Sequence, residues 1–195
     1  MSSLQERIED LRQDIVADPP RISAYHDLPF AVFRYEPGEE FDCRTRMRLL
    51  AISLEQNHQR RVTFISLAEL LWKAIRETEG VPAIIEEERE YGFDRAQRTV
   101  STILSDPDFA PLAVELERRI KSLSPATDLV FLVRAAAFAP AIYHLSKLLD
   151  EMQGRTLVPI ILWYPGRLEE GTNSALVYMS MHGREAIGNY RVRIY

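Results

Sequence analysis

Two nearly uninterrupted apolar runs, with an amphipathic segment between them, constrain this chain more than any other feature. The runs lie at residues 128–133 and 157–163. The segment 136–152 places five apolar residues on one helical face: Phe138, Ile142, Leu145, Leu149 and Met152. Strands that are apolar at almost every position are buried on both faces, which is typical of a parallel sheet covered by helices. These runs therefore predict a βαβ unit.

The rest of the chain continues the alternation of strands and helices. Further strands are predicted at 30–35, 61–65, 175–180 and 190–195, and further helices at 4–17, 39–58 and from Ser66 to Gly80. Ser3 with Glu6, and Ser66 with Glu69, have the spacing of capping boxes that start two of these helices. The order of elements predicts an α/β fold: a three-layer, Rossmann-like, mostly parallel sheet with helices on both faces.

Residues 82–122 are more than a crossover between two strands needs, and they are rich in charge. We expect a helical insertion here, broken near 106–108, where a second helix begins. The glutamates at 86–88 and Glu90 fit a solvated helix face, and an acidic docking site is the alternative.

Two prolines make the central unit irregular. Pro159 falls within the run 157–163. Because proline cannot donate to a strand ladder, the strand either starts late or carries a bulge. Tyr164, Pro165 and Gly166 have the composition of a turn, which would end the strand and lead into a polar loop at 167–174.

The composition suits one globular domain spanning 1–195, because 46% of the residues are hydrophobic and 27% are charged. No apolar run approaches the roughly 18 to 20 residues of a membrane helix, and the N-terminal segment lacks the apolar stretch of a signal peptide. We therefore expect a cytoplasmic protein. The net charge of −5 argues against general nucleic-acid binding, and the four widely spaced histidines do not predict a metal site.

The common catalytic templates are absent from the sequence. None of the eight glycines opens a Walker-type or dinucleotide-type phosphate loop, and there is no nucleophile elbow. The predicted fold is thus like that of a P-loop NTPase without its Walker A motif. The turn at 35–40 carries three carboxylates and a proline, which disfavour phosphate there. Cys43, the only cysteine, is expected to be a packing residue, with a stabilised thiolate as the alternative. We expect no catalytic residues and no cofactor.

A few side chains near the predicted strand ends are the candidate site. Chemistry in open α/β sheets lies beyond the carboxyl ends of the strands. Arg134 follows an apolar strand, and because an unpaired buried charge is costly, we expect it to have a partner: an internal carboxylate, a ligand or another protein. Tyr164 ends the neighbouring strand, in position to share that crevice. Arg44 and Arg48 share one helix face and either pair with acids such as Glu40 or bind an anion.

Several blocks of the sequence resemble one bacterial family closely. They lie at 128–135, 139–143, 148–154, 158–160, 163–166 and 189–195, with shorter ones at 27–30 and 65–72. Over nearly its whole length, the chain resembles BrxB, a small core protein of the BREX bacteriophage-exclusion systems. These blocks are typical of the family and do not form a catalytic signature.

The resemblance implies an antiphage defence component encoded beside a DNA methyltransferase, a large ATPase and an alkaline-phosphatase-like protein. It implies no catalytic activity that maps onto residues here. We expect a non-enzymatic assembly or adaptor subunit that bridges larger BREX proteins, with the phosphatase-like PglZ protein as the first partner to test. The predicted terminal strand 190–195, with one wet face, offers a further edge for a partner.

Two other functions stay open at this point. A small-molecule or nucleotide sensor would use the crevice near Arg134 and Tyr164. A DNA-binding module would use Arg184, Arg191 and Arg193, against the acidic charge of the chain. The candidate ligand or partner site therefore comprises Arg134, Tyr164, Arg44, Arg48, Tyr190 and Arg191.

Overall fold

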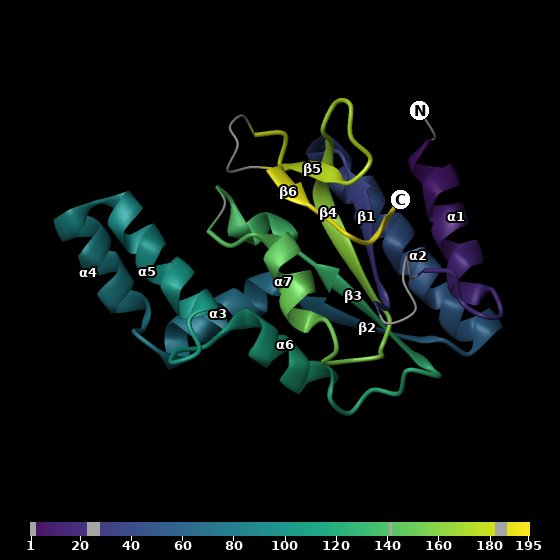
Figure 1. The fold of residues 1–195 in the computed structure, drawn as a ribbon, viewed down its shortest axis with the longest axis horizontal. Helices are drawn as coiled ribbons and strands as arrows, with labels where there is room; N and C mark the ends of the chain where they lie inside the picture. Colours follow the sequence, from purple (N-terminus) through teal and green to yellow (C-terminus); the bar gives the residue numbers. More distant parts are fainter. Residues whose placement is uncertain (1–2, 23–27, 141, 182–186) are drawn as a thin grey trace.

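A parallel sheet of five strands lies at the centre of the computed structural model (Figure 1). The structure describes residues 3–22, 28–140, 142–181 and 187–195. The strands are β1 (Phe30–Tyr35), β2 (Arg61–Ser66), β3 (Asp128–Val133), β4 (Ile160–Leu168) and β7 (Arg193–Ile194), in the order β2-β3-β4-β1-β7. All neighbouring pairs in this order are parallel. Two further strands, β5 (Ala175–Tyr178) and β6 (Ile187–Asn189), continue from the end of β4 as an antiparallel extension.

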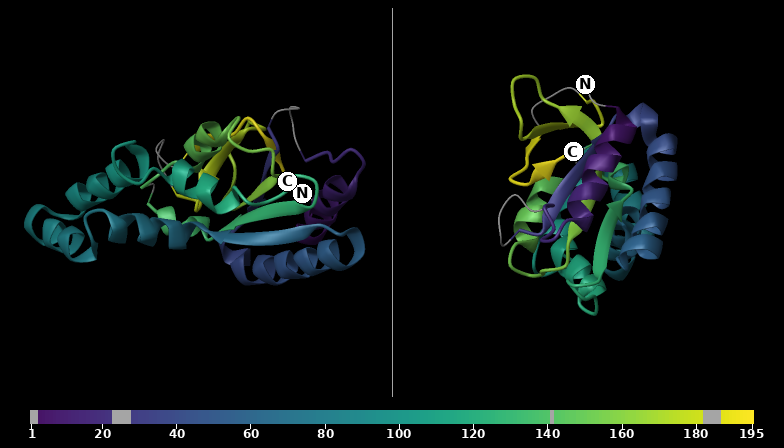
Figure 2. Two further views of the ribbon diagram at one scale, coloured as in Figure 1. Left: turned by 90° about the horizontal axis from the view of Figure 1, so that it is seen from below. Right: turned by 90° about the vertical axis from the view of Figure 1, so that its right-hand side faces the viewer.

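Helices cover both faces of the sheet (Figure 2). One face carries α1 (Leu4–Val16) and α2 (Glu40–His58), and the other carries α3 (Leu67–Glu77), α6 (Leu112–Ile120) and α7 (Leu145–Met152), with α5 (Phe93–Ser105) packed against α3. Side chains of a strand alternate between its faces. Phe131 and Trp163 therefore pack with α1 and α2, whereas Leu132 and Tyr164 pack with the other helices. This arrangement confirms the predicted three-layer α/β fold.

The chain crosses the sheet in two directions. From β1 it passes through the short helix η1 (Pro37–Glu39) and α2 to β2, over one face. From β2 through β3 to β4 it returns over the other face. Since β4 and β3 lie between β1 and β2 in the sheet, α2 spans them on its way. Connections that leave the strand ends towards opposite faces open a crevice at the carboxyl edge of such sheets.

The central βαβ unit differs from the prediction in its helix. The segment 136–152 is not one helix: η2 (Ala135–Phe138) is a short 3-10 helix, and α7 begins only at Leu145. Pro140 explains the break, because a proline in a helix interior removes a hydrogen bond and clashes with the preceding turn. Residue 141 of the predicted helix lies outside the described residues. Four of the five predicted inward residues are buried and Ile142 is partly buried.

The strand of that unit starts late, which is one of the two alternatives predicted at Pro159, and it ends later than predicted. It starts after Pro159, whose carbonyl accepts a hydrogen bond from Val130 N at 2.8 Å. The corner at Pro165 and Gly166 is not a turn, because β4 continues to Leu168 and pairs there with β5. Gly166 permits this close pairing: a Cβ at this position would lie 2.2 Å from the carbonyl oxygen of Val177.

The insertion contains three helices. After α3, α4 (Val81–Tyr91) and α5 form a hairpin around Gly92, which has a φ of 87°. That conformation suits glycine and ends α4, a break that the prediction missed. The predicted break near 106–108 is confirmed, because α5 ends at Ser105 and α6 begins at Leu112. In Figures 1 and 2, α4 and α5 project away from the sheet as an arm.

The C-terminal strands are shorter than predicted. β5 ends at Tyr178 because Met179 and Ser180 have positive φ angles. Within 190–195, only Arg193 and Ile194 form a strand, which pairs with β1 at the edge of the sheet.

Both predicted helix starts use their serines. Ser3 and Glu6 form a complete capping box, and Ser66 Oγ accepts a hydrogen bond from Glu69 N at 3.3 Å.

An ion pair between an exposed arginine and a buried carboxylate joins β2 and β3 at their amino ends. The carboxylate of Asp128, with no exposed surface, accepts hydrogen bonds from Arg61 at 2.6 and 2.9 Å and from Ser124 N at 2.6 Å. These donors, Arg61 first, lower the pKa of Asp128.

We expect Gly166→Ala to lower the free energy of unfolding by about 2–3 kcal/mol, because the added methyl group meets backbone that cannot move aside. Urea denaturation measures this loss. Gly38→Ala is the control, since nothing lies within 4 Å of a Cβ there. Equal losses in the two variants would contradict the packing argument.

We expect the free energy of unfolding of Asp128→Asn to depend less on pH in the acidic range than that of the wild type. A carboxylate whose pKa is lower in the folded state contributes stability above its ordinary pKa, near 4, and loses it as the pH falls through the folded value. Wild-type stability should therefore fall more steeply than that of the variant on acidification. Urea midpoints between neutral and acidic pH measure the difference. Asp108→Asn, an exposed carboxylate, should follow the wild type.

Candidate functional site

A cavity of about 330 Å³ lies at the carboxyl edge of the sheet, between α2 and the ends of the strands. The helix contributes one face, with Glu40, Arg44 and Arg48 at successive turns. The strands contribute Phe64 and Ser66 from β2, Val133 and the following Arg134 from β3, and Trp163 from β4. Three of the six predicted site residues thus meet here: Arg44, Arg48 and Arg134.

The three arginines differ in their partners. Arg44 Nε lies 3.9 Å from Glu40 Oε1, the i,i+4 pairing that the sequence predicts. Glu40 also accepts a hydrogen bond from the Tyr35 hydroxyl. Arg48 and Arg134 are exposed, and neither makes an ion pair with a residue that the structure describes. Two guanidinium groups at the cavity are therefore free to bind an anion.

The solvent exposure of Arg134 differs from the prediction. It is exposed rather than buried, so no internal carboxylate is needed to offset its charge. Its backbone has a φ of 60° and a ψ of 38°, the left-handed conformation that a long side chain rarely adopts. This conformation ends β3 and starts η2. Arg134 also lines a second cavity with Pro165 and Met179.

Trp163, and not Tyr164, faces the arginine cavity. Trp163 is 2% exposed and its ring lies 4.6 Å from that of Phe33, between centroids. Its indole Nε1 is buried and has no hydrogen-bond partner among the described residues. An unmade hydrogen bond at a buried donor is costly, so enclosing this N–H lowers the stability that packing the indole provides.

Tyr164 and Tyr190 lie together on the opposite face of the sheet. Their ring centroids are 5.4 Å apart, and Tyr178 packs against Tyr164 at 5.7 Å. Burial raises the pKa of Tyr164 to about 12 and that of Tyr190 well above its ordinary value. The prediction that Tyr164 shares the crevice of Arg134 is therefore wrong, because neighbouring strand positions face opposite ways. Arg191 is exposed beside α7, away from the arginine cavity.

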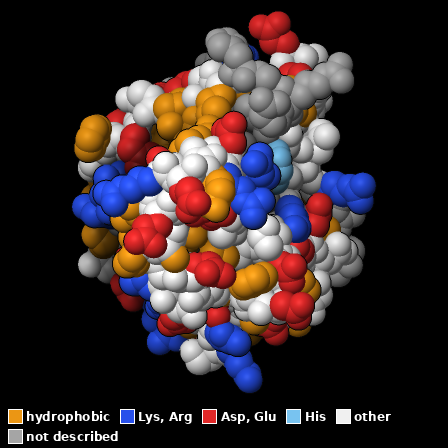
Figure 3. All heavy atoms as spheres, turned by 90° about the vertical axis from the view of Figure 1, so that its left-hand side faces the viewer, with side chains coloured by type: hydrophobic (Ala, Val, Ile, Leu, Met, Phe, Trp, Pro, Cys, Tyr) orange, Lys and Arg blue, Asp and Glu red, His pale blue; other side chains and the backbone are white. Residues whose placement is uncertain are grey.

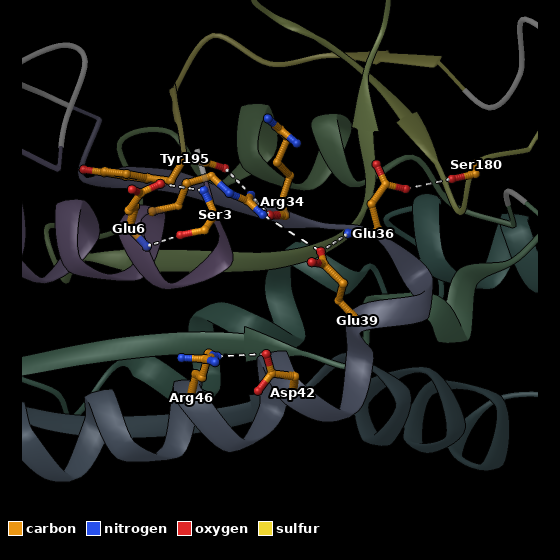
Figure 4. A network of polar contacts seen from close by, with 10 residues as sticks. Ser3, Glu6, Arg34, Glu36, Glu39, Asp42, Arg46, Ser180 and Tyr195 are labelled. Atoms are coloured by element: carbon orange, nitrogen blue, oxygen red, sulfur yellow. Dashed lines mark hydrogen bonds and ion pairs between the residues drawn. The ribbon is translucent and has the colours of Figure 1, made fainter. Parts of the chain in front are cut away.

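The carboxylates of the turn between β1 and α2 interact with other groups of this chain, as Figure 4 shows. Glu39 accepts a hydrogen bond from Glu36 N at 3.1 Å and lies 4.0 Å from Arg7. Glu36 accepts a bond from Ser180 Oγ at 3.4 Å. On α2, Arg46 pairs with Asp42 at 2.8 Å. The hydrogen bonds and ion pairs at this turn stabilise its own carboxylates, and the turn is not a phosphate loop.

Residues 63–192 match the family described as BREX protein BrxB. The chain belongs to the BrxB family. It is therefore a component of a BREX system, as the sequence blocks predict. No curated protein matches the chain, and neither does any solved structure.

The BrxB match begins within β2 and ends before β7. It includes the strand ends that carry Arg134 and Trp163. It does not include α2, so Arg44 and Arg48 lie outside the segment that defines membership. No helix in the described ranges of this BrxB-family protein is long and apolar enough to span a membrane.

Two other candidate residues of this BrxB-family protein, Cys43 and Arg193, are held by packing or by contacts within the chain. Burial, and then the nearby Glu40, raise the pKa of the Cys43 thiol, which therefore stays protonated near neutral pH. Arg193 is held by Asp14 at 2.6 Å and lies over the ring of Tyr195. Arg184, also considered for DNA binding, lies outside the described residues.

We expect Arg134→Asn to keep the stability of the wild type, because asparagine tolerates the left-handed conformation. Arg134→Val should lower the free energy of unfolding by about 1–2 kcal/mol, because a β-branched residue is strained there. Thermal and urea denaturation measure both. Equal stability of the two variants would show that the backbone relaxes instead.

Proposed function

We propose that this BrxB-family protein is a non-enzymatic assembly subunit that bridges larger proteins of its BREX system. A PglZ-like, alkaline-phosphatase-fold protein is the first partner, with the methyltransferase and the ATPase as further ones. Membership of the family supports the BREX setting. The bridging role is supported by two separate surfaces with uncovered apolar side chains.

The arm formed by α4 and α5 is the observation that carries this proposal. None of the residues in α4, all of which the structure describes, is buried. Ile85, Tyr91 and Phe93 leave large apolar surfaces exposed on the arm, with Tyr91 65% exposed. Figure 3, a view from the side of α4 and α5, shows apolar side chains exposed among charged ones. An exposed apolar surface with polar residues around it is typical of a protein contact.

Hydrogen bonds between α4 and α5 stabilise the arm. Glu87 on α4 binds Arg95 at 3.0 Å and Thr99 at 2.9 Å, both on α5. Ala96, Val100 and Ile103 of α5 are buried. The arm is thus a preformed element, and binding a partner through it would not require the hairpin to fold first.

The outer side of α2 is the second surface. Phe41, Leu49 and Ile52 are exposed there, with Phe41 81% exposed, whereas Met47, Leu50 and Leu54 face the sheet. Helix α2 thus carries apolar residues on the side that faces the sheet and on the side that faces away from it. A surface helix that contacts only solvent on its outer side is normally polar there. Figures 1 and 2 place α2 far from α4 and α5, so the two surfaces can contact different partners at once.

Co-purification tests the proposal. The tagged protein, expressed with the other proteins of its BREX system, should recover the PglZ-like protein. Tyr91→Ala with Phe93→Ala, and separately Phe41→Ala with Leu49→Ala, should each lower the recovery of a different partner by about tenfold or more, the size of effect at contact hot spots. These side chains are exposed, so the variants should fold normally.

Leu157→Ala is the matched control, because Leu157 is exposed outside both surfaces. It should recover every partner at the wild-type level. Recovery of no BREX protein by the wild type would refute the assembly role. Unchanged recovery by both double variants would refute the proposal that these two surfaces bind the partners.

A further inference from the structure

We propose that the cavity between α2 and the ends of β2, β3 and β4 binds a small phosphate ester of about mononucleotide size. This ligand site is separate from the two surfaces of the assembly proposal and does not depend on them. The cavity, at about 330 Å³, falls in the range of roughly 300–1,000 Å³ that small-molecule sites occupy.

The charge of the cavity selects an anion. Arg44, Arg48 and Arg134 line it, and only Arg44 has a carboxylate partner among the described residues, at the long distance of 3.9 Å. The helix and the β3–η2 connection supply these groups independently, so they approach a ligand from two sides. Guanidinium groups bind phosphate and carboxylate oxygens through paired hydrogen bonds.

The indole of Trp163 adds an independent observation. It lines the same cavity, is 2% exposed, and has a buried Nε1 without a partner in the described chain. Its neighbours Phe33 and Phe131 hold the ring at centroid distances of 4.6 and 5.2 Å. The enclosed N–H has almost no accessible surface, so the indole contributes ring surface, and not a donor, to the lining.

Two guanidinium groups without carboxylate partners in the described chain favour phosphate over carboxylate. A carboxylate offers two oxygens in one plane, whereas a phosphate ester offers three non-ester oxygens in a tetrahedron. Guanidinium groups that come from two elements can each bind a different pair of these oxygens.

The remaining lining suits the ester portion of the ligand. Glu40 and Glu69 add acceptors that bind hydroxyl groups, as acidic residues do with ribose in nucleotide sites. Phe64 is partly exposed at the cavity and offers a ring face. The two acids also limit the positive charge, which disfavours a polyphosphate. A phosphorylated sugar or nucleoside fits this combination.

Isothermal titration calorimetry of the full chain tests the site with four probes: adenosine monophosphate, ribose phosphate, adenosine and succinate. We expect the two phosphate esters to bind with a Kd of about 1 mM or lower. Adenosine and succinate should bind at least about tenfold more weakly, because each lacks the phosphate group.

Three variants separate the site from general charge effects. Arg48→Ala with Arg134→Asn should weaken binding of the phosphate esters at least about tenfold, whereas Trp163→Phe should change it little, because the indole N–H has no access to the cavity. Arg46→Ala is the control, because Arg46 lies on the same helix, pairs with Asp42 and does not line the cavity. It should bind like the wild type. Thermal melts establish that each variant is folded.

Three results would overturn the proposal. One is the absence of binding by both phosphate esters. Another is equal weakening by Arg46→Ala and by the double arginine variant, which would indicate attraction by overall charge only. The third is binding of succinate in preference to the esters, which would indicate a site for carboxylates, such as those of a partner protein. Normal recovery of BREX partners alongside any of these results would leave the assembly proposal standing.

Discussion

Burial of both faces of β4 is the constraint on which the rest of the structure depends. The strand pairs with β1, β3 and β5, and residues from Ile160 to Gly166 are all buried. Its alternating side chains join two cores: Ile161 and Trp163 pack beneath α1 and α2, while Leu162 and Tyr164 pack beneath the other helices. Burying this apolar surface from both sides is what favours a three-layer fold over a single-sided sheet. Gly166 then lets the same strand approach β5 closely without a gap in the sheet.

Local pattern was sufficient for the sheet and for most of the core. The apolar runs predict β3 and the path of β4, because burial on both faces leaves few polar positions to obscure the signal. The break at Pro140 and the turn at Gly92 had local signals as well, a helix-breaking proline and a glycine between charged helices. Alternation along β4 also indicates that Trp163 and Tyr164 face opposite ways, but the pattern does not say which of them faces α2.

Strand order is the part that the sequence could not provide. Arg44 and Arg48 are some ninety residues before Arg134, and no local pattern relates them. They meet because β4 and β3 are inserted between β1 and β2, so that α2 must cross both strands. Pairing between distant strands is non-local, and its register is fixed by packing that only the folded chain reveals. The same insertion explains why Trp163 lines one cavity with arginines that come from another part of the chain.

The conformation of Arg134 connects the fold to the cavity. A left-handed arginine costs about 1–2 kcal/mol relative to a residue that adopts this conformation freely, and glycine or asparagine would end β3 at lower cost. The side chain makes no ion pair with the described residues, so its charge does not offset the strain within the part of the chain that the structure describes. Strained residues of this kind cluster at binding sites, where the contact that justifies them is made with another molecule. Arg134 lines the same cavity as Arg48, which likewise makes no ion pair with a described residue. Backbone strain and two guanidinium groups unpaired within the described chain thus occur at one place, which is the physical reason to look for a ligand there.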